Sequence, residues 1–252
     1  MITLLRKEIR AQWRTHRVLI VAALLLLFGL TSPLLVRYLP DIINSLGGLP
    51  PEFAELIPPP SVGDAIAQYI KNLTQFGIVL ALLVPMGAVV REKERGTAAM
   101  LLSKPVSRAS FLLAKFAALA LTFLTGLVLA GLGGYYYSGV LFEWLDLGRF
   151  SLLNGLLWLY FLVYVALTLL ASTLARSQVA AGGMAFVLYL LLLVPESIPP
   201  LGNYLPGAVV MWGGRLALGQ AGDPAWVALG VSLGLIAAAL LGAWGILRGQ
   251  EI

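Results

Sequence analysis

Residues with chemical reactivity are scarce in this chain, and their spacing matches no hydrolytic or metal-binding motif. No cysteine occurs among the 252 residues, which excludes disulfides, thiolate metal sites and cysteine nucleophiles. The single histidine, His16, stands among basic residues before the first apolar run, where a solvated or headgroup position is expected. There is no G-x-x-x-x-G-K-[ST], H-E-x-x-H or G-x-S-x-G motif. We therefore expect no catalysis, metal or cofactor in this chain.

The most informative polar group is residues 91–108, which read Arg-Glu-Lys-Glu-Arg-Gly-Thr and then Ala-Ala-Met-Leu-Leu-Ser-Lys-Pro-Val-Ser-Arg. Residues 98–103 suit a short helix that ends at Lys104, because the following proline disfavours helix in the residue before it. Met100 and Leu101 stand beside the charges of Glu92 and Glu94, a mixture of anchor and rim that is found at protein interfaces. A partner groove explains this patch, and the alternative is that its apolar side chains dip into the membrane surface.

The elements that must position this group are membrane-spanning helices. The chain is 60% hydrophobic and only 12% charged, with a mean hydropathy of +0.91, whereas soluble domains are about 25% charged. A span needs about 20 apolar residues. We predict an all-α integral membrane protein with a single transmembrane domain, 1–252, and six spans at 18–36, 72–90, 111–137, 152–175, 179–194 and 225–247.

Residues 1–17 predict an additional helix that lies in the plane of the membrane surface. Leu4, Leu5, Ile9 and Trp13 recur there at helical spacing among five arginine and lysine residues, at 6, 7, 10, 14 and 17. Such an amphipathic helix sits in the headgroup layer with its basic face toward anionic lipid.

The distribution of basic residues predicts that both termini are cytoplasmic. With that orientation all but four of the 17 Lys and Arg residues lie on the inner side, the exceptions being Arg37, Lys71, Arg149 and Arg215. Positive charge accumulates on the cytoplasmic side of membrane proteins, and an even number of spans agrees with it. The net charge of +5 is therefore a topology signal, and we expect no binding to nucleic acid.

Three smaller features are assigned from residue type. The segment 195–224 is rich in Pro and Gly and favours re-entrant or interfacial pieces rather than a full span. Asn72 and Gln75, at the start of the second span, are candidates for lining a path. Small residues recur in the last span with the small-x-x-x-small spacing that marks close helix packing, expected here within the subunit; they are Gly230, Gly234, Ala238 and Gly242.

Three short motifs in residues 91–116 match one known family. They are Glu-Arg-Gly-Thr at 94–97, Leu-Leu-Ser-Lys-Pro-Val-Ser-Arg at 101–108 and Phe-Leu-Leu-Ala-Lys-Phe at 111–116. Together they resemble the membrane subunits of type-2 ABC exporters, and the most similar group includes the permeases for nitrous-oxide-reductase maturation, sodium and bacitracin export. The opening Lys-Glu-Ile-Arg at 7–10 is similar to that group too.

The resemblance implies that the segment after the second span is a coupling helix that docks into a separate ATPase subunit. The N-terminal helix would steady it, and the segment between spans five and six would form re-entrant hairpins near the outer face. Two permeases, as a homo- or heterodimer, would work with two ATPases, which bind the ATP and Mg. The docking residues implied are Glu92, Glu94, Arg95, Gly96, Thr97, Met100 and Leu101.

These observations predict the permease subunit of an ATP-driven exporter in the cytoplasmic membrane. The first alternative is a membrane anchor or assembly factor that recruits a partner ATPase and transports nothing. The second is a membrane enzyme that acts on lipid headgroups, which would require clustered His, Asp or Glu at the interface, and the sequence shows no convincing cluster. No intramembrane charge or aromatic cage in the sequence identifies the substrate.

Overall fold

The described part of the chain is built from helices. The computed structural model describes residues 2–45, 59–94 and 107–249, and no strand occurs in these ranges. Six helices are long and apolar enough to cross a membrane, which confirms the predicted all-α fold with six candidate spans. They are α2 (Arg17–Ser45), α4 (Val62–Leu83), α7 (Arg108–Leu141), α8 (Leu147–Leu174), α9 (Gln178–Glu196) and α11 (Trp226–Gly249).

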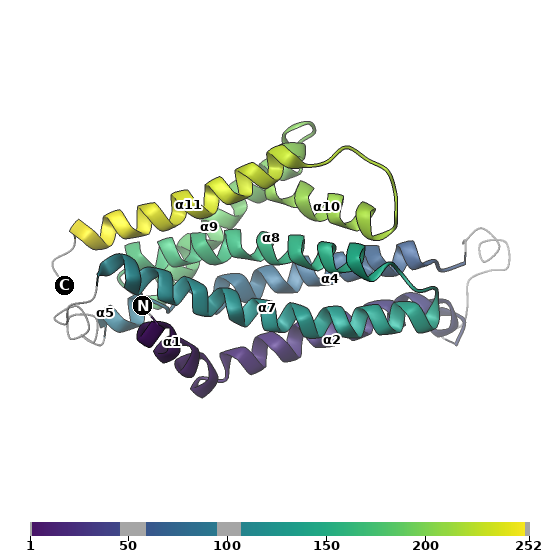
Figure 1. The fold of residues 1–252 in the computed structure, drawn as a ribbon, viewed down its shortest axis with the longest axis horizontal. Coiled ribbons are helices and arrows are strands. Elements are labelled where there is room, and N and C mark those ends of the chain that lie inside the picture. The colour runs from purple at the N-terminus through teal and green to yellow at the C-terminus, as the bar shows by residue number, and fades with distance from the viewer. Residues whose placement is uncertain (1, 46–58, 95–106, 250–252) are drawn as a thin grey trace.

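Helix α8 forms the centre of the bundle (Figure 1). It packs against α4, α7, α9 and α11, and also against the short helix α10 (Pro206–Ala217). Leu153, Leu157 and Phe161 on α8 are fully buried. Helix α2 lies along α7, and both chain termini lie at the same end of the bundle. This end is called the terminal end below, and the opposite one the distal end.

Glycines permit the closest contacts between the spans. A side chain at Gly29 of α2 would place its Cβ 2.4 Å from the backbone oxygen of Ala130 on α7. A Cβ at Gly77 of α4 would lie 2.2 Å from Cζ of Phe161 on α8. Both distances are far below van der Waals contact, so only glycine lets these helices approach so closely, as small residues commonly do in membrane bundles.

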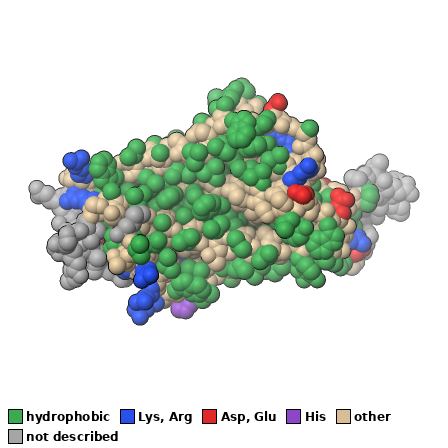
Figure 2. All heavy atoms as spheres, in the orientation of Figure 1, with side chains coloured by type: hydrophobic (Ala, Val, Ile, Leu, Met, Phe, Trp, Pro, Cys, Tyr) green, Lys and Arg blue, Asp and Glu red, His purple; other side chains and the backbone are tan. Residues whose placement is uncertain are grey.

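The surface of the bundle is apolar between two charged ends. Figure 2 shows hydrophobic side chains over the middle of the face, with Lys and Arg near the terminal end and acidic and basic groups toward the distal end. Helices α9 and α11 expose large apolar side chains, including Val187, Leu191, Leu233 and Leu241. An apolar band of this kind faces hydrocarbon in a membrane protein.

The N-terminal helix α1 (Ile2–Arg14) is separate from the first span. The chain turns between them at Thr15 and His16, and His16 adopts a positive φ of 57°, a conformation that His tolerates better than most residues. The buried residues of α1 are Glu8 and Gln12, whereas Trp13 is exposed. The helix predicted in this region forms over Ile2–Arg14, with its basic side chains exposed and Leu4, Leu5 and Ile9 half-buried.

Helix α4 begins at Val62, well before the span expected from Asn72 onward. Ser61 caps it, since its Oγ accepts a hydrogen bond from the Asp64 backbone N–H while the Asp64 carboxylate accepts one from the Ser61 N–H. This reciprocal pair satisfies two of the backbone donors that every helix start leaves open. The helix ends at Leu83, and a turn over 84–89 leads into the short helix α5 (Val90–Glu94).

Between α9 and α11 the chain forms a short hairpin at the distal half of the bundle. It contains one 3-10 turn, η1 (Leu201–Tyr204), and the 12-residue helix α10, which lies against α8. A helix of this length is too short to span about 30 Å of hydrocarbon. The expectation that residues 195–224 contain no full span agrees with these bounds.

Candidate functional site: the α5 junction

The first part of the predicted coupling segment is the helix α5, at the terminal end of the bundle. Of the docking residues expected from sequence, Glu92 and Glu94 belong to it. Arg95, Gly96, Thr97, Met100 and Leu101 lie outside the described residues. The following helix α7 starts at Arg108, so the coupling segment is bounded on both sides by helices of the bundle.

A cluster of four charged side chains joins α5 to α1 and α7. Its members, called the ionic cluster below, are Lys7, Glu8, Glu92 and Lys115. The Lys115 ammonium lies 3.0 Å from Oε1 of Glu92 and 3.3 Å from each carboxylate oxygen of Glu8. The Lys7 ammonium lies 3.3 Å from the same Oε1 of Glu92 and 3.4 Å from Oε1 of Glu8. Two cations and two anions thus link three separate elements.

The burial of Lys115 makes this cluster a structural requirement. Only 4% of its side chain is exposed, against 43% for Lys7. A buried charge is tolerated only when it is paired and hydrogen-bonded, so Lys115 needs both carboxylates. Its ammonium also stands 4.8 Å from the centre of the Phe111 ring one turn earlier. The carboxylate of Glu92, expected from sequence to belong to the docking surface, is therefore turned into the bundle.

Hydrogen bonds fix the same region to α8. The hydroxyl of Ser172 accepts bonds from the backbone N–H groups of Val89 and Val90, at 3.0 and 3.2 Å, where α5 begins. The ammonium of Lys93 donates to the backbone oxygen of Thr173. Burial against α8 lowers the pKa of Lys93 from its ordinary value, because removal from water disfavours the charged form. Serine and threonine near the end of α8 thus act as attachment points for α5.

Two arginines complete the junction. Arg91 donates from Nε to the side-chain oxygen of Gln178 at the start of α9. Arg108, at the start of α7, donates to the backbone oxygens of Leu247 and Arg248 at the end of α11. In this way α5 contacts α1, α7, α8 and α9 through polar groups, and displacement of α5 must strain or move those helices.

Glu94 points outward from this junction. It is exposed, and with Lys93, Leu174, Ala175 and Arg176 it lines a shallow cavity of about 450 Å³ beside the turn between α8 and α9. The surface presented here is mixed, with an acid, two bases and apolar groups in one hollow. Such a surface suits reversible protein contact better than lipid, which would favour an apolar lining.

Comparison with known proteins identifies the family of the chain. Residues 2–210 match the family described as ABC-2 family transporter protein. The chain belongs to this ABC-2 family. It is also 30% identical over 213 residues to the uncharacterized transmembrane protein YxlG of Bacillus subtilis (strain 168), an alignment that covers 83% of this chain and 81% of that protein.

Membership of the ABC-2 family establishes the general role. Its members are the membrane components of ABC transporters, so this chain is a multi-pass membrane permease that associates with an ATPase subunit. The match covers α1, all of the spans before α11 and the ionic cluster. The family resemblance expected from residues 91–116 is confirmed at this level.

The structure places the two candidate path residues apart from any large cavity. Asn72 is buried, donates to the hydroxyl of Ser32 at 2.9 Å and accepts from Gln68 at 2.9 Å. Gln75 lies at an exposed position on α4. Ile70 and Thr74 of the same helix instead line a cavity of about 730 Å³.

The small-residue ladder of α11 meets a neighbouring helix only near its end, where a Cβ at Gly242 would lie 3.4 Å from Cδ1 of Leu170 on α8. A Cβ at Gly230 or Gly234 would meet nothing within 4 Å. The described residues pack against the opposite side of the helix, where Ser232, Ala239 and Ala243 are buried. The small-residue spacing therefore predicts that these residues share one side of the helix, but it does not predict what packs against that side. The exposed members of the ladder are Gly230, Gly234, Ala238 and Gly242.

Several residues that build the junction are not predictable from their local sequence. Lys7 and Glu8 belong to the motif at 7–10 and Lys115 to the motif at 111–116, but neither motif predicts a contact with Glu92. Ser172 lies in the fourth predicted span, 152–175, and serine in a span commonly bonds backbone groups. One signal was available, since a lysine one turn into an apolar span requires a carboxylate nearby.

Proposed function

We propose that this permease is the membrane subunit of an ATP-driven exporter of the cytoplasmic membrane, and that its ATPase docks on α5, the segment after it and the turn between α8 and α9. Both termini and this docking surface face the cytoplasm. ATP and Mg bind in the partner subunit, and the chain hydrolyses nothing itself. Two permeases, identical or different, assemble with two ATPases.

The observation that supports this proposal is the attachment of α5 to four helices at once. Force applied to a slack loop is lost, whereas force applied to α5 reaches α1 and α7 through the ionic cluster and α8 through Ser172 and Lys93. Closure of the ATPases on ATP then moves these helices as a body. Such a movement requires that the ATPase make different contacts in two conformations of the permease.

A specific feature favours transport over a role as an anchor. A cavity of about 730 Å³ lies between α4, α8 and the hairpin, remote from the docking surface. An anchor needs only the docking surface. A transporter also needs a substrate site whose conformation changes when the ATPase acts on the docking surface.

The proposal is tested by charge reversal at Glu94, which is exposed beside the turn between α8 and α9. Glu94→Lys should weaken co-purification with the cognate ATPase by about tenfold or more, because like charges at an interface oppose binding. ATP turnover stimulated by the permease should fall with it. Glu143→Lys, an exposed acid between α7 and α8, is the matched control and should behave as wild type.

Met100→Asp, in the apolar part of the same segment, should have a similar effect, since loss of an apolar anchor costs on the order of 2 kcal/mol. Should both variants bind and stimulate the ATPase like the parent, the segment does not dock the ATPase and the proposal is wrong.

A further inference from the structure

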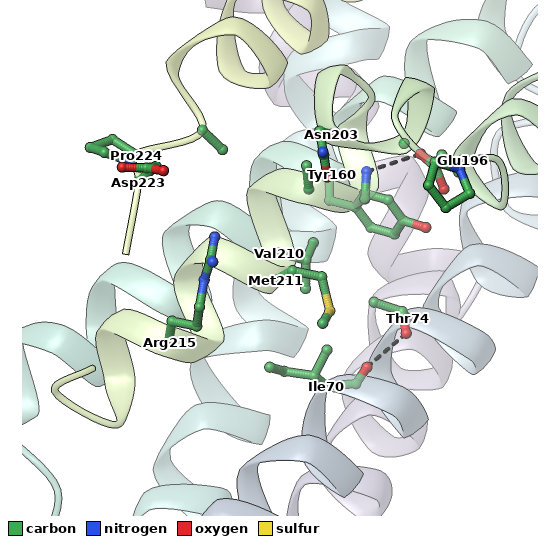
Figure 3. A pocket seen from close by; sticks show the side chains of 15 residues that line it. Ile70, Thr74, Tyr160, Glu196, Asn203, Val210, Met211, Arg215, Asp223 and Pro224 are labelled. Carbon is green, nitrogen blue, oxygen red and sulfur yellow. Dashed lines mark hydrogen bonds between the residues drawn. The ribbon is translucent and has the colours of Figure 1, made fainter. Parts of the chain in front are cut away.

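One cavity in the described part of the protein has a charge distribution that indicates a ligand class. It has a volume of about 730 Å³ and lies between α4, α8, the end of α9, α10 and the chain before α11 (Figure 3). Volumes of about 300–1,000 Å³ are usual for sites that take drug-sized molecules. Its apolar lining comes chiefly from Ile70, Val210 and Met211.

Glu196, at the last position of α9, provides a carboxylate without a basic partner. No Lys, Arg or His side chain of the described residues lies within ion-pair distance of it. One oxygen, Oε1, accepts the backbone N–H of Gly207 at 2.9 Å. A Cβ at Gly207 would come within 3.1 Å of the other oxygen, so glycine keeps room for the carboxylate at the cavity wall.

An aromatic ring lies beside this carboxylate. Figure 3 shows the Tyr160 side chain next to Glu196, and both line the cavity. Tyr160 is 95% buried, and its ring is held edge-to-face by Tyr164 at a centroid distance of 5.1 Å. A carboxylate beside the π face or edge of a fixed tyrosine is the combination that binds organic cations, because the ring quadrupole and the anion both attract positive charge.

The other end of the cavity carries opposite charges. Arg215 and Asp223 both line it there, away from Glu196 (Figure 3). Their charges offset one another, so the excess negative charge of the cavity belongs to the Glu196 end. Arg215 also disfavours a second cationic group on the same ligand.

A metal ion does not fit this site. The described residues contain no group of three or more His, Cys, Asp or Glu side chains that would hold one. A hard cation such as Ca²⁺ needs six to eight oxygen ligands to replace its hydration shell, and a single carboxylate cannot supply them. A large, weakly hydrated organic cation has no such requirement.

We propose that the cavity binds an amphipathic organic cation with a single positive charge. The charged group lies against Glu196 and Tyr160, and the apolar body lies along Ile70, Val210 and Met211. This inference deepens the proposed transport function, on which it rests, by assigning the chemical class of the substrate.

The test is direct binding to the purified full-length permease in detergent, without any ATPase. Radiolabelled tetraphenylphosphonium is the probe, and tetraphenylborate, which has nearly the same shape and the opposite charge, is its counterpart. Wild type should bind the phosphonium at least tenfold more tightly. Glu196→Gln keeps the acceptor for Gly207 and removes the charge, so it should weaken phosphonium binding by about tenfold or more and abolish the preference.

Glu143→Gln removes an exposed acid that does not line the cavity and should leave binding unchanged. Met211→Trp fills the apolar part of the cavity and should weaken phosphonium binding by about fivefold or more even if Glu196→Gln proves unstable. Equal affinity of wild type for the two probes, or undiminished phosphonium binding in Glu196→Gln or Met211→Trp, would overturn the proposal.

A lipid headgroup and a free solute share the proposed chemistry. Displacement of the phosphonium by mixed micelles containing an aminoacylated phospholipid identifies a lipid occupant, and displacement by soluble tetrapentylammonium alone identifies a solute; either supports a cation site. Since no ATPase is present, this result is independent of whether Glu94→Lys disturbs docking. Failure of docking and failure of cation binding are therefore distinguishable.

Discussion

A single lysine illustrates how individual residues determine the junction. Lys115 lies within α7, a helix that is otherwise apolar around it, and its side chain is almost fully buried. Its partners are distant in the sequence, because Glu8 stands 107 positions away. A lysine in this position predicts that some carboxylate is near, but nothing in the local pattern says which. Periodicity identifies the face of a helix, whereas the pairing of charges requires the packed structure.

Removal of this charge should destabilise the permease. Lys115→Met removes the buried ammonium that pairs with the carboxylates of Glu8 and Glu92, and breaking a buried ion pair costs about 3–5 kcal/mol. Thermal unfolding in detergent measures the loss. Lys7→Met is the matched control and should cost about 1 kcal/mol or less, because exposed ion pairs contribute little. Equal effects of the two substitutions would show that Lys115 is not the centre of the cluster.

At the level of elements, hydropathy predicts where the helices lie more accurately than where each helix ends or which helices it contacts. The apolar run that begins at Asn72 was read as the start of the second span, but the helix begins at Val62 behind a capping pair of Ser61 and Asp64. Asp64 and Lys71 are compatible with a helix, but their charges lower the mean hydropathy of the segment. A span predicted from hydropathy therefore starts after them. The small residues of α11 show a similar limit to sequence-based prediction. They permit close packing, but they do not identify the helix that packs against them.

Glycine substitutions test which helix contacts matter. Gly29→Ala should lower stability by about 1–3 kcal/mol, because the new methyl group would collide with the Ala130 backbone and push α2 from α7. Gly234→Ala should be neutral or stabilising by up to about 1 kcal/mol, since nothing lies near that position and alanine favours helix. Thermal unfolding of both variants in detergent is the measurement. A larger loss for Gly234→Ala would mean that the ladder is packed after all.

The attachment of α5 to α8 has its own test. Ser172→Ala leaves the Val89 and Val90 backbone N–H groups without their acceptor, and an unsatisfied buried donor costs about 1–3 kcal/mol. Faster hydrogen–deuterium exchange is expected in the peptide that covers residues 84–94, with little change in α2. Thr125→Ala removes an exposed hydroxyl from α7 and should leave exchange in the peptide that covers residues 84–94 unaltered. Unchanged exchange in the Ser172 variant would mean that α5 is held mainly by other contacts.

For the whole molecule, composition predicted the number of spans and the fold class but not the large cavity. The cavity takes residues from four separate parts of the chain, near positions 70, 160, 196–215 and 223, and each is unremarkable in its own segment. Glu196 lies in the Pro- and Gly-rich segment 195–224, and nothing in that sequence indicates that its carboxylate faces a cavity. Its meaning depends on the tertiary contact that brings it to Tyr160 and on the absence of a basic side chain near it among the described residues.

The orientation of the bundle is the last prediction, and it decides which face meets the ATPase. Six spans place both termini at one end, where Arg91, Lys93, Arg108 and Arg248 gather, so the positive-inside tendency puts that end in the cytoplasm. Since the chain has no cysteine, single cysteines can be labelled without background. In intact cells an impermeant maleimide should label Glu143→Cys, between α7 and α8, and should label Arg176→Cys, between α8 and α9, only after lysis. The reverse pattern would invert the permease and place α5 where no cytoplasmic ATPase reaches it. Labelling of both in intact cells would contradict the assignment of α8 as a span that separates the two positions.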